Sequence, residues 1–351
     1  MVGGLARSQR RWAVVFLLPM LLALGGAAGW PLLRTAMLSL TDAGLSTEGA
    51  RFVGLENYLS YGPDPAAYDA GLGGYYVLDV ARDADLVWRP GSDSYFNADT
   101  GQPAPAPAEN TLFAWRGVLT QPAWWRAVGV TLGLAVASVL LETVLGVAMA
   151  LFLARPMRGR ALLRASVLVP WAIPTVVGAQ LWNWMLNDQY GVLNAALIGL
   201  GLIPRGIAWT AEPGLSLLAI LVADVWKTTP FIALLALAAL HLVPEAVREA
   251  ARVDGVGCWG MLRHITLPLI APAVLVAVMF RAIDALRLFD LVFVMTGNSP
   301  NTATMSIYAR QQMVDFQRLG FGSAASMVLV AIVALVAAVL LTLGRRRGAV
   351  L

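Results

Sequence analysis

The chain has 351 residues, of which 58% are hydrophobic and only 13% are charged, with a formal net charge of +4. Soluble domains are about one quarter charged, so this composition excludes a soluble globular protein and predicts an integral membrane protein. Because the basic residues cluster at the ends of apolar runs, we interpret them as topology signals and expect no nucleic-acid partner.

The composition also excludes several kinds of catalytic site. The only lysine is Lys227, which follows Trp226, so the chain lacks the Gly-Lys-Ser/Thr sequence of a phosphate-binding loop and does not hydrolyse ATP by itself. His241 and His264 are too far apart for an H-E-x-x-H zinc site, no G-x-S-x-G sequence occurs, and Cys258 is the only cysteine. We therefore predict a chain that is not an enzyme and that has no catalytic residue, metal ligand or cofactor of its own.

Stretches of roughly 20 mostly apolar residues predict the membrane-spanning helices. In chain order, about six stretches qualify: residues 12–33, 127–154, 165–186, 215–240, 267–295 and 323–343. The first follows three arginines, but it is too long for the apolar region of a signal peptide and lacks a small-residue cleavage site, so we predict a retained helix. The fifth is longer than a bilayer is thick, which predicts either a start outside the hydrocarbon or a tilted helix.

The distribution of arginine predicts the orientation of these helices. With the N-terminus inside, the arginine clusters lie in the cytoplasm and the short external loops hold only Arg205, Arg310 and Arg318. The arginines on the cytoplasmic side are Arg7, Arg10, Arg11, Arg155, Arg158, Arg160, Arg164, Arg248, Arg252, Arg263, Arg345, Arg346 and Arg347. Both termini are therefore predicted to be cytoplasmic.

A long external segment separates the first two spans. Residues 35–126 follow the N-terminus and first helix (residues 1–34) and precede the membrane core (residues 127–343) and a short tail (residues 344–351). The middle of this segment is acidic and rich in aromatic residues, and it ends in alternating proline and alanine at 103–107, which is typical of a stiff linker. We interpret it as a small external subdomain, whose aromatic residues either pack together or contact a partner.

The loop between the fourth and fifth spans carries the most specific pattern. Pro244 suits the first position of a helix, Glu245 and Glu249 complement the positive end of its dipole, and Gly255 suits the left-handed residue that ends it. A short helix over about residues 244–255 is therefore predicted on the cytoplasmic surface. From helix propensity alone, a simple capped loop helix explains the pattern equally well.

This loop resembles, in residue order and spacing, the EAA loop of permease subunits of binding-protein-dependent ABC importers. The residues that carry the resemblance are Glu249, Ala250, Ala251, Gly255, Ile265, Leu267 and Pro268. Three further segments, residues 52–58, 224–231 and 289–297, resemble the carbohydrate-uptake branch of that family, and most closely the permeases of maltose and trehalose importers. The resemblance covers nearly the whole chain except about residues 61–110.

The resemblance implies an all-α polytopic membrane protein with the type I ABC importer permease fold. It further implies a pore formed with a second, non-identical permease subunit in the cytoplasmic membrane of a prokaryote, two ATPase subunits that bind ATP and magnesium, and an extracytoplasmic solute-binding protein. In this family the EAA helix lies in a groove of the ATPase and transmits its closure to the spans. The implied substrate is a di- or oligosaccharide such as trehalose or maltose, or else a related osmolyte or glycerol phosphate.

Ionisable residues inside predicted spans usually face a bundle interior or a cavity. Arg281, Asp284 and Arg287 are spaced three residues apart, so we predict a triad in which Asp284 reaches either arginine. This triad either neutralises charge and holds helices together or lines a translocation path. The other ionisable residues in the predicted spans are Glu142, Asp224, Lys227 and Asp290.

A neutral sugar needs hydrogen-bonding groups and an aromatic face. The residues that we assign to a substrate path on this basis are Gln180, Trp182, Asn183, Trp184, Thr228 and Thr229, and the path alternative for the triad adds Asp284 and Arg287. Tryptophans near the end of a span are also common as interfacial anchors, which is the alternative explanation for this cluster.

Two other functional classes fit a chain of this composition. An ion-driven secondary transporter would use the carboxylates within the spans, and its uptake would be abolished by an uncoupler but would not depend on an ATPase. A membrane-embedded enzyme, such as a transferase acting on a lipid-linked sugar, would need a catalytic acid, nucleophile or metal cluster, and the sequence contains no specific one.

Overall fold

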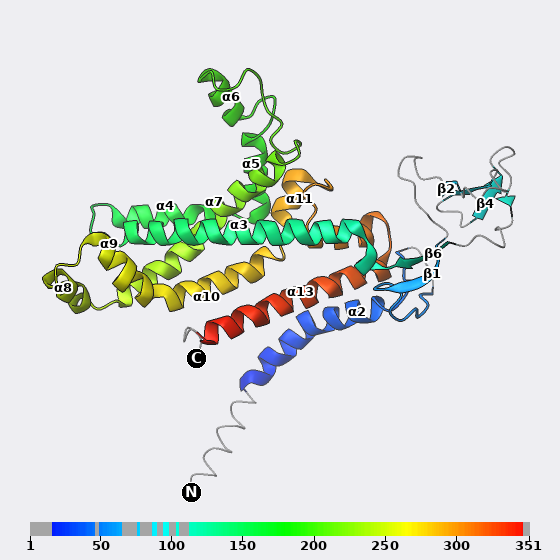
Figure 1. Ribbon diagram of the computed structural model, residues 1–351, viewed down its shortest axis with the longest axis horizontal. Coiled ribbons are helices and arrows are strands. Elements are labelled where there is room, and N and C mark those ends of the chain that lie inside the picture. The colour runs from blue at the N-terminus through cyan, green and yellow to red at the C-terminus, as the bar shows by residue number, and fades with distance from the viewer. Residues whose placement is uncertain are drawn as a thin grey trace, which may run out of the picture. The chain divides into compact units, whose positions relative to one another are not determined.

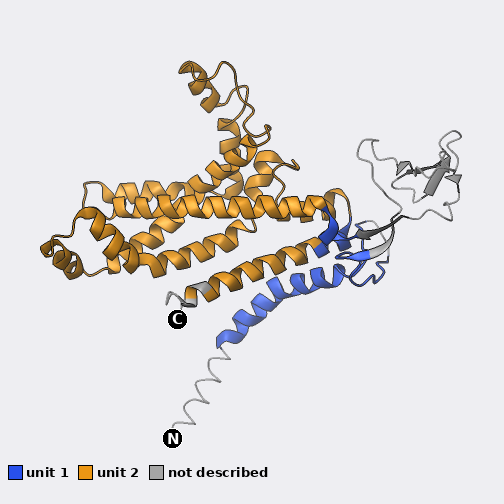
Figure 2. Cartoon of the chain, in the orientation of Figure 1, with its two compact units in different colours: residues 1–121, 318–324 blue, residues 122–317, 325–351 orange. Residues whose placement is uncertain are grey.

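The computed structural model describes residues 16–45, 49–64, 76–77, 86–89, 94–97, 103–104 and 112–346. The predicted cytoplasmic arginines Arg7, Arg10, Arg11 and Arg347 lie outside the described residues. The chain divides into two compact units (Figure 2). Unit 1 comprises residues 1–121 and 318–324, and unit 2 comprises residues 122–317 and 325–351.

The described membrane core is helical, as the sequence predicts (Figure 1). Within the part of the chain that the structure describes, five helical segments are long and apolar enough to cross a membrane, namely Phe16–Leu38, Pro122–Leu153, Leu215–Leu242, Cys258–Ala285 and Leu319–Thr342. A sixth span is possible if one bent pair, Arg160–Ala172 with Thr175–Met185, is counted as a single span. The prediction of about six spans in a helical membrane core is therefore confirmed.

The first span is helical from residue 16. From residue 25 onward, the helices in chain order are η1 Gly25–Gly29, α2 Trp30–Leu38, η3 Val118–Thr120, α3 Pro122–Leu153, α4 Arg160–Ala172, α5 Thr175–Met185, α6 Val192–Gly199, α7 Leu215–Leu242, α8 Glu245–Val253, α9 Cys258–Gly260, η4 Met261–Thr266, α10 Leu267–Ala285, α11 Asp290–Thr296, α12 Met305–Arg310, η5 Gln311–Asp315 and α13 Leu319–Arg346.

The core of unit 2 lies where α3, α7 and α10 pack side by side (Figure 1). Small residues let these helices approach closely, as is usual in membranes, where packing rather than hydrophobic burial drives helix association. A Cβ atom placed on Gly146 of α3 would lie only 2.9 Å from the Cβ of Ile232 on α7, so this crossing requires glycine. Alanines and leucines fill the interface on either side of the crossing, including the fully buried Ala150 and Ala236.

The third predicted span is not one straight helix. The sequence predicts a single span over residues 165–186, but the structure divides it into α4 and α5, whose axes differ by 93°. Ile173 has φ −68° and ψ 132° because the ring of Pro174 disfavours a helical conformation in the residue before it. The prediction of an unbroken span was wrong at this position, although the proline was visible in the sequence.

The fifth predicted span is also divided. The sequence predicts one helix over residues 267–295, whereas α10 ends at Ala285 and α11 begins at Asp290. The helical segment also starts earlier, at Cys258, through the π-helical turn η4. The apolar stretch therefore contains a break, while the continuous segment Cys258–Ala285 has 28 residues, so a tilt and a start outside the hydrocarbon both stay open as predictions. Thr304 donates to the carbonyl of Leu288 at 3.0 Å and so satisfies one backbone group in the break.

Unit 1 contains the strands of the described chain, all between residues 60 and 116. Strand β1 (Ser60–Asp64) pairs with β6 (Leu112–Arg116) in an antiparallel register that places Ser60 opposite Arg116 and Asp64 opposite Leu112. A four-stranded antiparallel sheet follows the order β2 (Tyr76–Val77), β3 (Leu86–Arg89), β4 (Ser94–Asn97) and β5 (Pro103–Ala104). The predicted external subdomain thus has a two-stranded stem and a small sheet.

The segment 52–58 joins the first span to this stem. The side-chain amide of Asn57 donates to the carbonyls of Ser39 at 2.9 Å and Thr41 at 2.7 Å, just beyond the end of α2. The hydroxyl of Tyr58 donates to that of Ser39 at 2.7 Å. The bonds from Asn57 satisfy backbone carbonyls beyond the end of the helix, and the bond from Tyr58 holds a side chain at the same place, so we assign both residues a structural role.

Candidate functional site

The predicted surface helix is present as α8. It begins after Pro244, which is extended (ψ 135°) and lies just outside the helix rather than at its first position, as the sequence analysis had placed it. Gly255 follows the helix with φ +75°, a left-handed conformation. The N–H groups of Gly255 and Val256 donate to the carbonyls of Arg252 at 3.1 Å and Ala251 at 2.9 Å. This pair of bonds is the Schellman motif, so the glycine has the role that was predicted for it.

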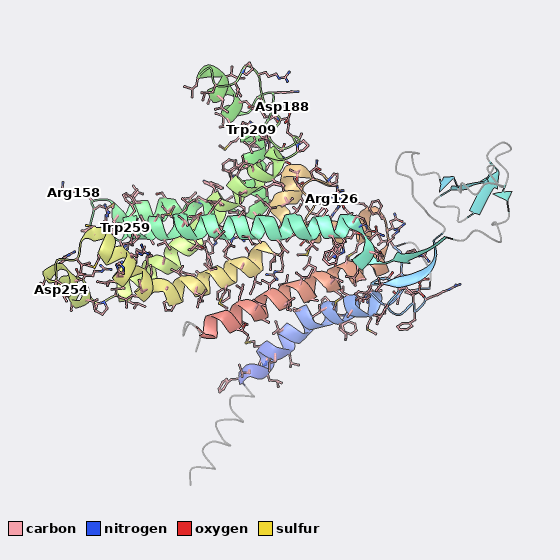
Figure 3. All side chains as sticks on the ribbon, in the orientation of Figure 1. Arg126, Arg158, Asp188, Trp209, Asp254 and Trp259 are labelled. Carbon is pink, nitrogen blue, oxygen red and sulfur yellow. The ribbon has the colours of Figure 1, made fainter. Side chains whose placement is uncertain are left out.

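One face of α8 and its flanks is apolar and uncovered. Ala251 is buried, while Glu249 and Ala250 are exposed. Val253 is 88% exposed, and Leu242 and Trp259 beside the helix are 83% and 73% exposed. Figure 3 shows Trp259 and Asp254 at the same end of unit 2 as Arg158, which belongs to another loop predicted to be cytoplasmic.

The second half of the predicted EAA loop lies in the helix that follows. Ile265 is half-buried in the π-helical turn η4, and Leu267 and Pro268 begin α10. Leu267 and Pro268 line an apolar groove of about 410 Å³ between α10 and the Thr143–Val147 turn of α3. They are therefore placed to connect the loop to the core of the bundle.

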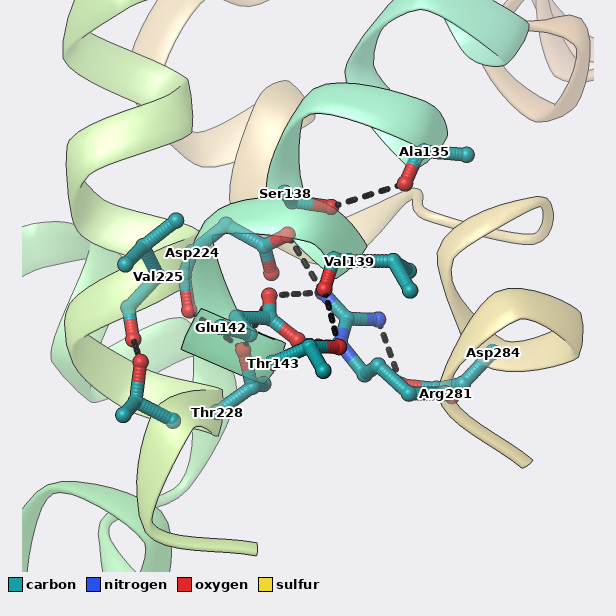
Figure 4. Close-up of polar contacts among 11 residues, drawn as sticks. Ala135, Ser138, Val139, Glu142, Thr143, Asp224, Val225, Thr228, Arg281 and Asp284 are labelled. Carbon is teal, nitrogen blue, oxygen red and sulfur yellow. Dashed lines mark hydrogen bonds and ion pairs between the residues drawn. The ribbon is translucent and has the colours of Figure 1, made fainter. Parts of the chain in front are cut away.

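The most unusual polar feature of unit 2 is a buried ion network that joins α3, α7 and α10 (Figure 4). Arg281 of α10 donates from Nε and Nη2 to the two carboxylate oxygens of Glu142 on α3, at 2.7 and 3.0 Å. Its Nη2 also bonds to Asp224 of α7. Glu142, Asp224 and Arg281 are 0%, 4% and 2% exposed. Thr228 of α7 donates to Glu142 at 2.7 Å and completes the network.

The predicted triad of Arg281, Asp284 and Arg287 was therefore wrong in its centre and in one member. Arg281, not Asp284, bonds to several partners, and Asp284 makes one bond to it at 3.1 Å. Arg287 lies beyond the end of α10, is exposed, and has no ion pair among the described residues. The i, i+3 spacing fails because the helix ends between Asp284 and Arg287.

Lys227, three residues after Asp224, connects α7 to the break between α4 and α5. Its Nζ donates to the carbonyl of Ile173 at 2.6 Å. A cation at this position complements the negative end of the α4 dipole. Irregular backbone at membrane depth needs partners for its polar groups, and the bond from Lys227 satisfies one carbonyl at this break.

The predicted cluster on the third span lies on α5. Gln180 and Trp184 are exposed, whereas Asn183 is half-buried and donates to the carbonyl of Val294 at 3.1 Å. Gln180, Asn183 and Trp184 share a polar pocket of about 220 Å³ with the loop that follows α5. Trp182 points elsewhere, because its ring packs edge to face with Trp226 at 5.8 Å.

The two predicted threonines on α7 differ in availability. Thr228 is half-buried and belongs to the ion network, whereas Thr229 is buried and donates to the carbonyl of Val225 at 2.6 Å. Sequence reasoning missed a third feature of this region, the stacked pair of Trp171 and Phe231, whose centroids are 6.4 Å apart. These rings lie on α4 and α7, so nothing local in the sequence relates them.

No group of three or more His, Cys, Asp or Glu side chains in the described part of the chain is arranged to hold a metal ion.

The family model described as "Binding-protein-dependent transport system inner membrane component" matches residues 142–347, more than half of the chain. This chain belongs to that family. The matched region begins at Glu142 of the ion network and contains α7, the coupling-loop candidate α8 and α10. As a member of the family the chain is a transport component of a membrane, not an enzyme, and it crosses the membrane several times.

Curated relatives resemble the same core. The "Trehalose/maltose transport system permease protein MalF" of Thermococcus litoralis is 42% identical over 234 residues, which cover 66% of this chain and 78% of the relative. The "Trehalose transport system permease protein SugA" of Mycobacterium tuberculosis is 40% identical over 226 residues, covering 64% and 72%. The "Inner membrane ABC transporter permease protein YcjO" of Escherichia coli is 25% identical over 93% of this chain and 92% of its own.

Solved structures resemble the fold. A chain of a bacterial alginate ABC transporter, solved in complex with alginate pentasaccharide-bound periplasmic protein, superposes with a TM-score of 0.60 at 24% identity. The match covers 65% of this chain and 81% of that one. The chain therefore has the type I ABC importer permease fold that the sequence predicted.

Proposed function

We propose that this chain is the pore-forming permease subunit of an ATP-driven importer for a di- or oligosaccharide such as trehalose or maltose. The observation that carries the proposal is α8: a capped surface helix whose Glu249-Ala250 face and neighbouring Val253 are uncovered in the chain. An exposed apolar surface of this kind fits a partner protein rather than water. The names of the relatives in Thermococcus litoralis and Mycobacterium tuberculosis support the choice of sugar.

The proposed coupling of ATP hydrolysis to transport uses α8 and the segment that joins it to α10. Two partner ATPases bind ATP and magnesium, and each permease subunit of a heterodimer docks one coupling helix on them. In this chain α8 docks, and Ile265, Leu267 and Pro268 transmit its displacement into α10. Closure of the ATPases then moves α10 and the helices packed on it, so that access alternates between the two sides of the membrane.

The orientation completes the assignment. Both termini lie in the cytoplasm of a prokaryotic cell, and the loops around Arg158 and Trp259, which share one end of unit 2, face the ATPases (Figure 3). The extracytoplasmic solute-binding protein delivers the sugar at the opposite side, and lipid surrounds the remaining apolar surface.

The substrate path runs between the two breaks in the helices. Asp284 and Arg287 flank the end of α10, and Gln180, Asn183 and Trp184 form the pocket on α5. Two further residues lie next to this lining: Thr228, which donates to Glu142, and Trp182, which packs against Trp226. Thr229 is left out of the proposed lining, because its hydroxyl is buried and already bonded to its own helix.

The test is to purify this chain with the neighbouring subunits of its transport system and to measure sugar-stimulated ATP hydrolysis in proteoliposomes. We expect the binding protein and trehalose or maltose together to raise hydrolysis severalfold, and a cellobiose control to have no effect. If only an osmolyte or glycerol phosphate stimulated hydrolysis, that compound and not a sugar would be the substrate. Uptake that an uncoupler abolishes and that needs no ATPase would contradict the importer and favour an ion-driven transporter.

The external subdomain gives a separate prediction. Asp64 and Leu112 are register partners at the end of the two-stranded stem, so an Asn-Gly turn is able to connect them in place of residues 65–111. We expect the shortened chain to insert normally but to lose most of the stimulation of ATP hydrolysis by the binding protein, because the acidic and aromatic segment that we assign to this contact is absent. Unchanged stimulation and transport would contradict a partner-binding role for the subdomain.

A further inference from the structure

Every nitrogen of the Arg281 guanidinium has an acidic partner. Nε and Nη2 bond to Glu142, Nη2 also bonds to Asp224, and Nη1 bonds to Asp284. The planar guanidinium presents its donors in a rigid fork, so its three partners fix its position and, in turn, it fixes theirs. Lysine, with a single nitrogen on a flexible stem, does not reproduce this geometry.

The three carboxylates differ in their surroundings. Glu142 and Asp224 are buried together with the guanidinium, whereas the side chain of Asp284 is 66% exposed. Asp284 lies one residue before the end of a helix that is apolar enough to cross the membrane. A carboxylate in such a helix faces a water-filled cavity or another protein rather than lipid. One oxygen of Asp284 is thus held by Arg281 while the carboxylate remains accessible.

Neutralisation of charge does not account for this arrangement. One carboxylate neutralises one guanidinium, yet two buried acids and one exposed acid surround Arg281. Apolar residues of similar volume generally stabilise a protein interior at least as well as a buried ion network does. A network of this kind is therefore better explained by what it positions than by the stability it supplies.

We propose that Arg281 is a positioning residue of the transport path: anchored by Glu142 and Asp224, it orients the exposed carboxylate of Asp284 to accept hydrogen bonds from hydroxyl groups of the transported sugar. Sugars present adjacent hydroxyls as donors, and an oriented carboxylate accepts two of them in a defined geometry. Asp284 then contacts the substrate, whereas Arg281 acts only through Asp284. The proposal rests on the function proposed above, because it requires a sugar as substrate.

The test compares a network variant with a contact variant in reconstituted transporter. The triple variant E142Q/D224N/R281M removes every charge that anchors Asp284, keeps the shapes of the two acidic side chains and leaves no buried charge unpaired, so we expect near-normal abundance. We expect the half-saturation concentration for trehalose, measured as uptake at a saturating concentration of the binding protein, to rise about tenfold, the loss typical of one charge-assisted hydrogen bond. The maximal rate should stay within about twofold of the wild type.

D284N, which alters the contact itself, should raise the half-saturation concentration to a similar extent. The control is R205M, which removes an exposed arginine in another loop and should leave that concentration unchanged.

The quadruple variant E142Q/D224N/R281M/D284N shows whether Arg281 acts through Asp284 or whether the two residues act independently. If Arg281 acts through Asp284, the quadruple variant should resemble the triple variant, because the energies of two coupled residues do not add. A triple variant with wild-type half-saturation would overturn the proposal, as would effects that multiply in the quadruple variant to about a hundredfold. A wild-type transporter that moves no sugar would contradict the proposed function itself, and the role of Arg281 would fall with it.

Discussion

Replacing Gly255 with valine is expected to lower sugar uptake at least about tenfold while the abundance of the chain stays near the wild-type level. Gly255 has φ +75°, and a residue with a Cβ atom pays about 1–2 kcal/mol to adopt that left-handed conformation. The chain is expected to leave it, which breaks the two bonds that end α8 and redirects the segment leading to α10. Coupling free energies are typically about 1–3 kcal/mol, so a displacement of α8 suffices to abolish most transport.

Gly257 provides a matched control two residues away. It has φ −66°, and a Cβ atom placed on it meets no other atom within 4 Å, so Gly257→Val adds the same side chain without strain. We expect this variant to transport normally. Glu249→Ala should weaken uptake by removing an exposed group that we assign to ATPase docking. The measurements are abundance in the membrane, retention of the ATPase on purification, and uptake. Full uptake in both Gly255→Val and Glu249→Ala would contradict the coupling-helix assignment.

Arg281→Ala is expected to destabilise the chain far more than Asp284→Ala. Removal of the guanidinium leaves Glu142 and Asp224 buried without a cation, and breaking a buried ion pair costs about 3–5 kcal/mol. Removal of Asp284 breaks one bond of a largely exposed side chain, for which about 0–1 kcal/mol is typical. This order is the reverse of the one that the three-residue spacing of the sequence suggests.

The measurement is the thermal unfolding midpoint of the detergent-solubilised chain, read together with its abundance. Arg287→Ala is the control for loss of an arginine, because Arg287 is exposed just beyond the same helix and has no ion pair among the described residues. We expect its midpoint to match the wild type. If Asp284→Ala proved as damaging as Arg281→Ala, the central position of Arg281 in the network would be wrong.

The breaks in the third and fifth spans show how far local sequence signals extend. Pro174 is a local signal for the first break, because a proline disfavours a helical conformation in the residue before it. Giving this effect more weight than the length of the apolar run would have predicted the break correctly. The break after Ala285 had no such signal, because neither glycine nor proline occurs between Leu286 and Phe289. There the chain leaves the helix in a segment whose carbonyl at Leu288 is satisfied by Thr304, a partner 16 residues away.

The sequence by itself determined the features that depend on neighbouring residues. Apolar runs of sufficient length specify helical spans, because a helix satisfies its backbone groups within one segment of the chain. Pro244 and Gly255 specify the bounds of α8, because their effects on φ and ψ are local. Only the tertiary structure decided the ion network. Glu142 and Arg281 are separated by 139 positions in the chain, and each is an isolated charge in an apolar run until α3, α7 and α10 pack together. The cost of burying a lone charge requires that each has a partner, but which helix supplies that partner depends on how the helices pack, and no periodicity within one helix records it.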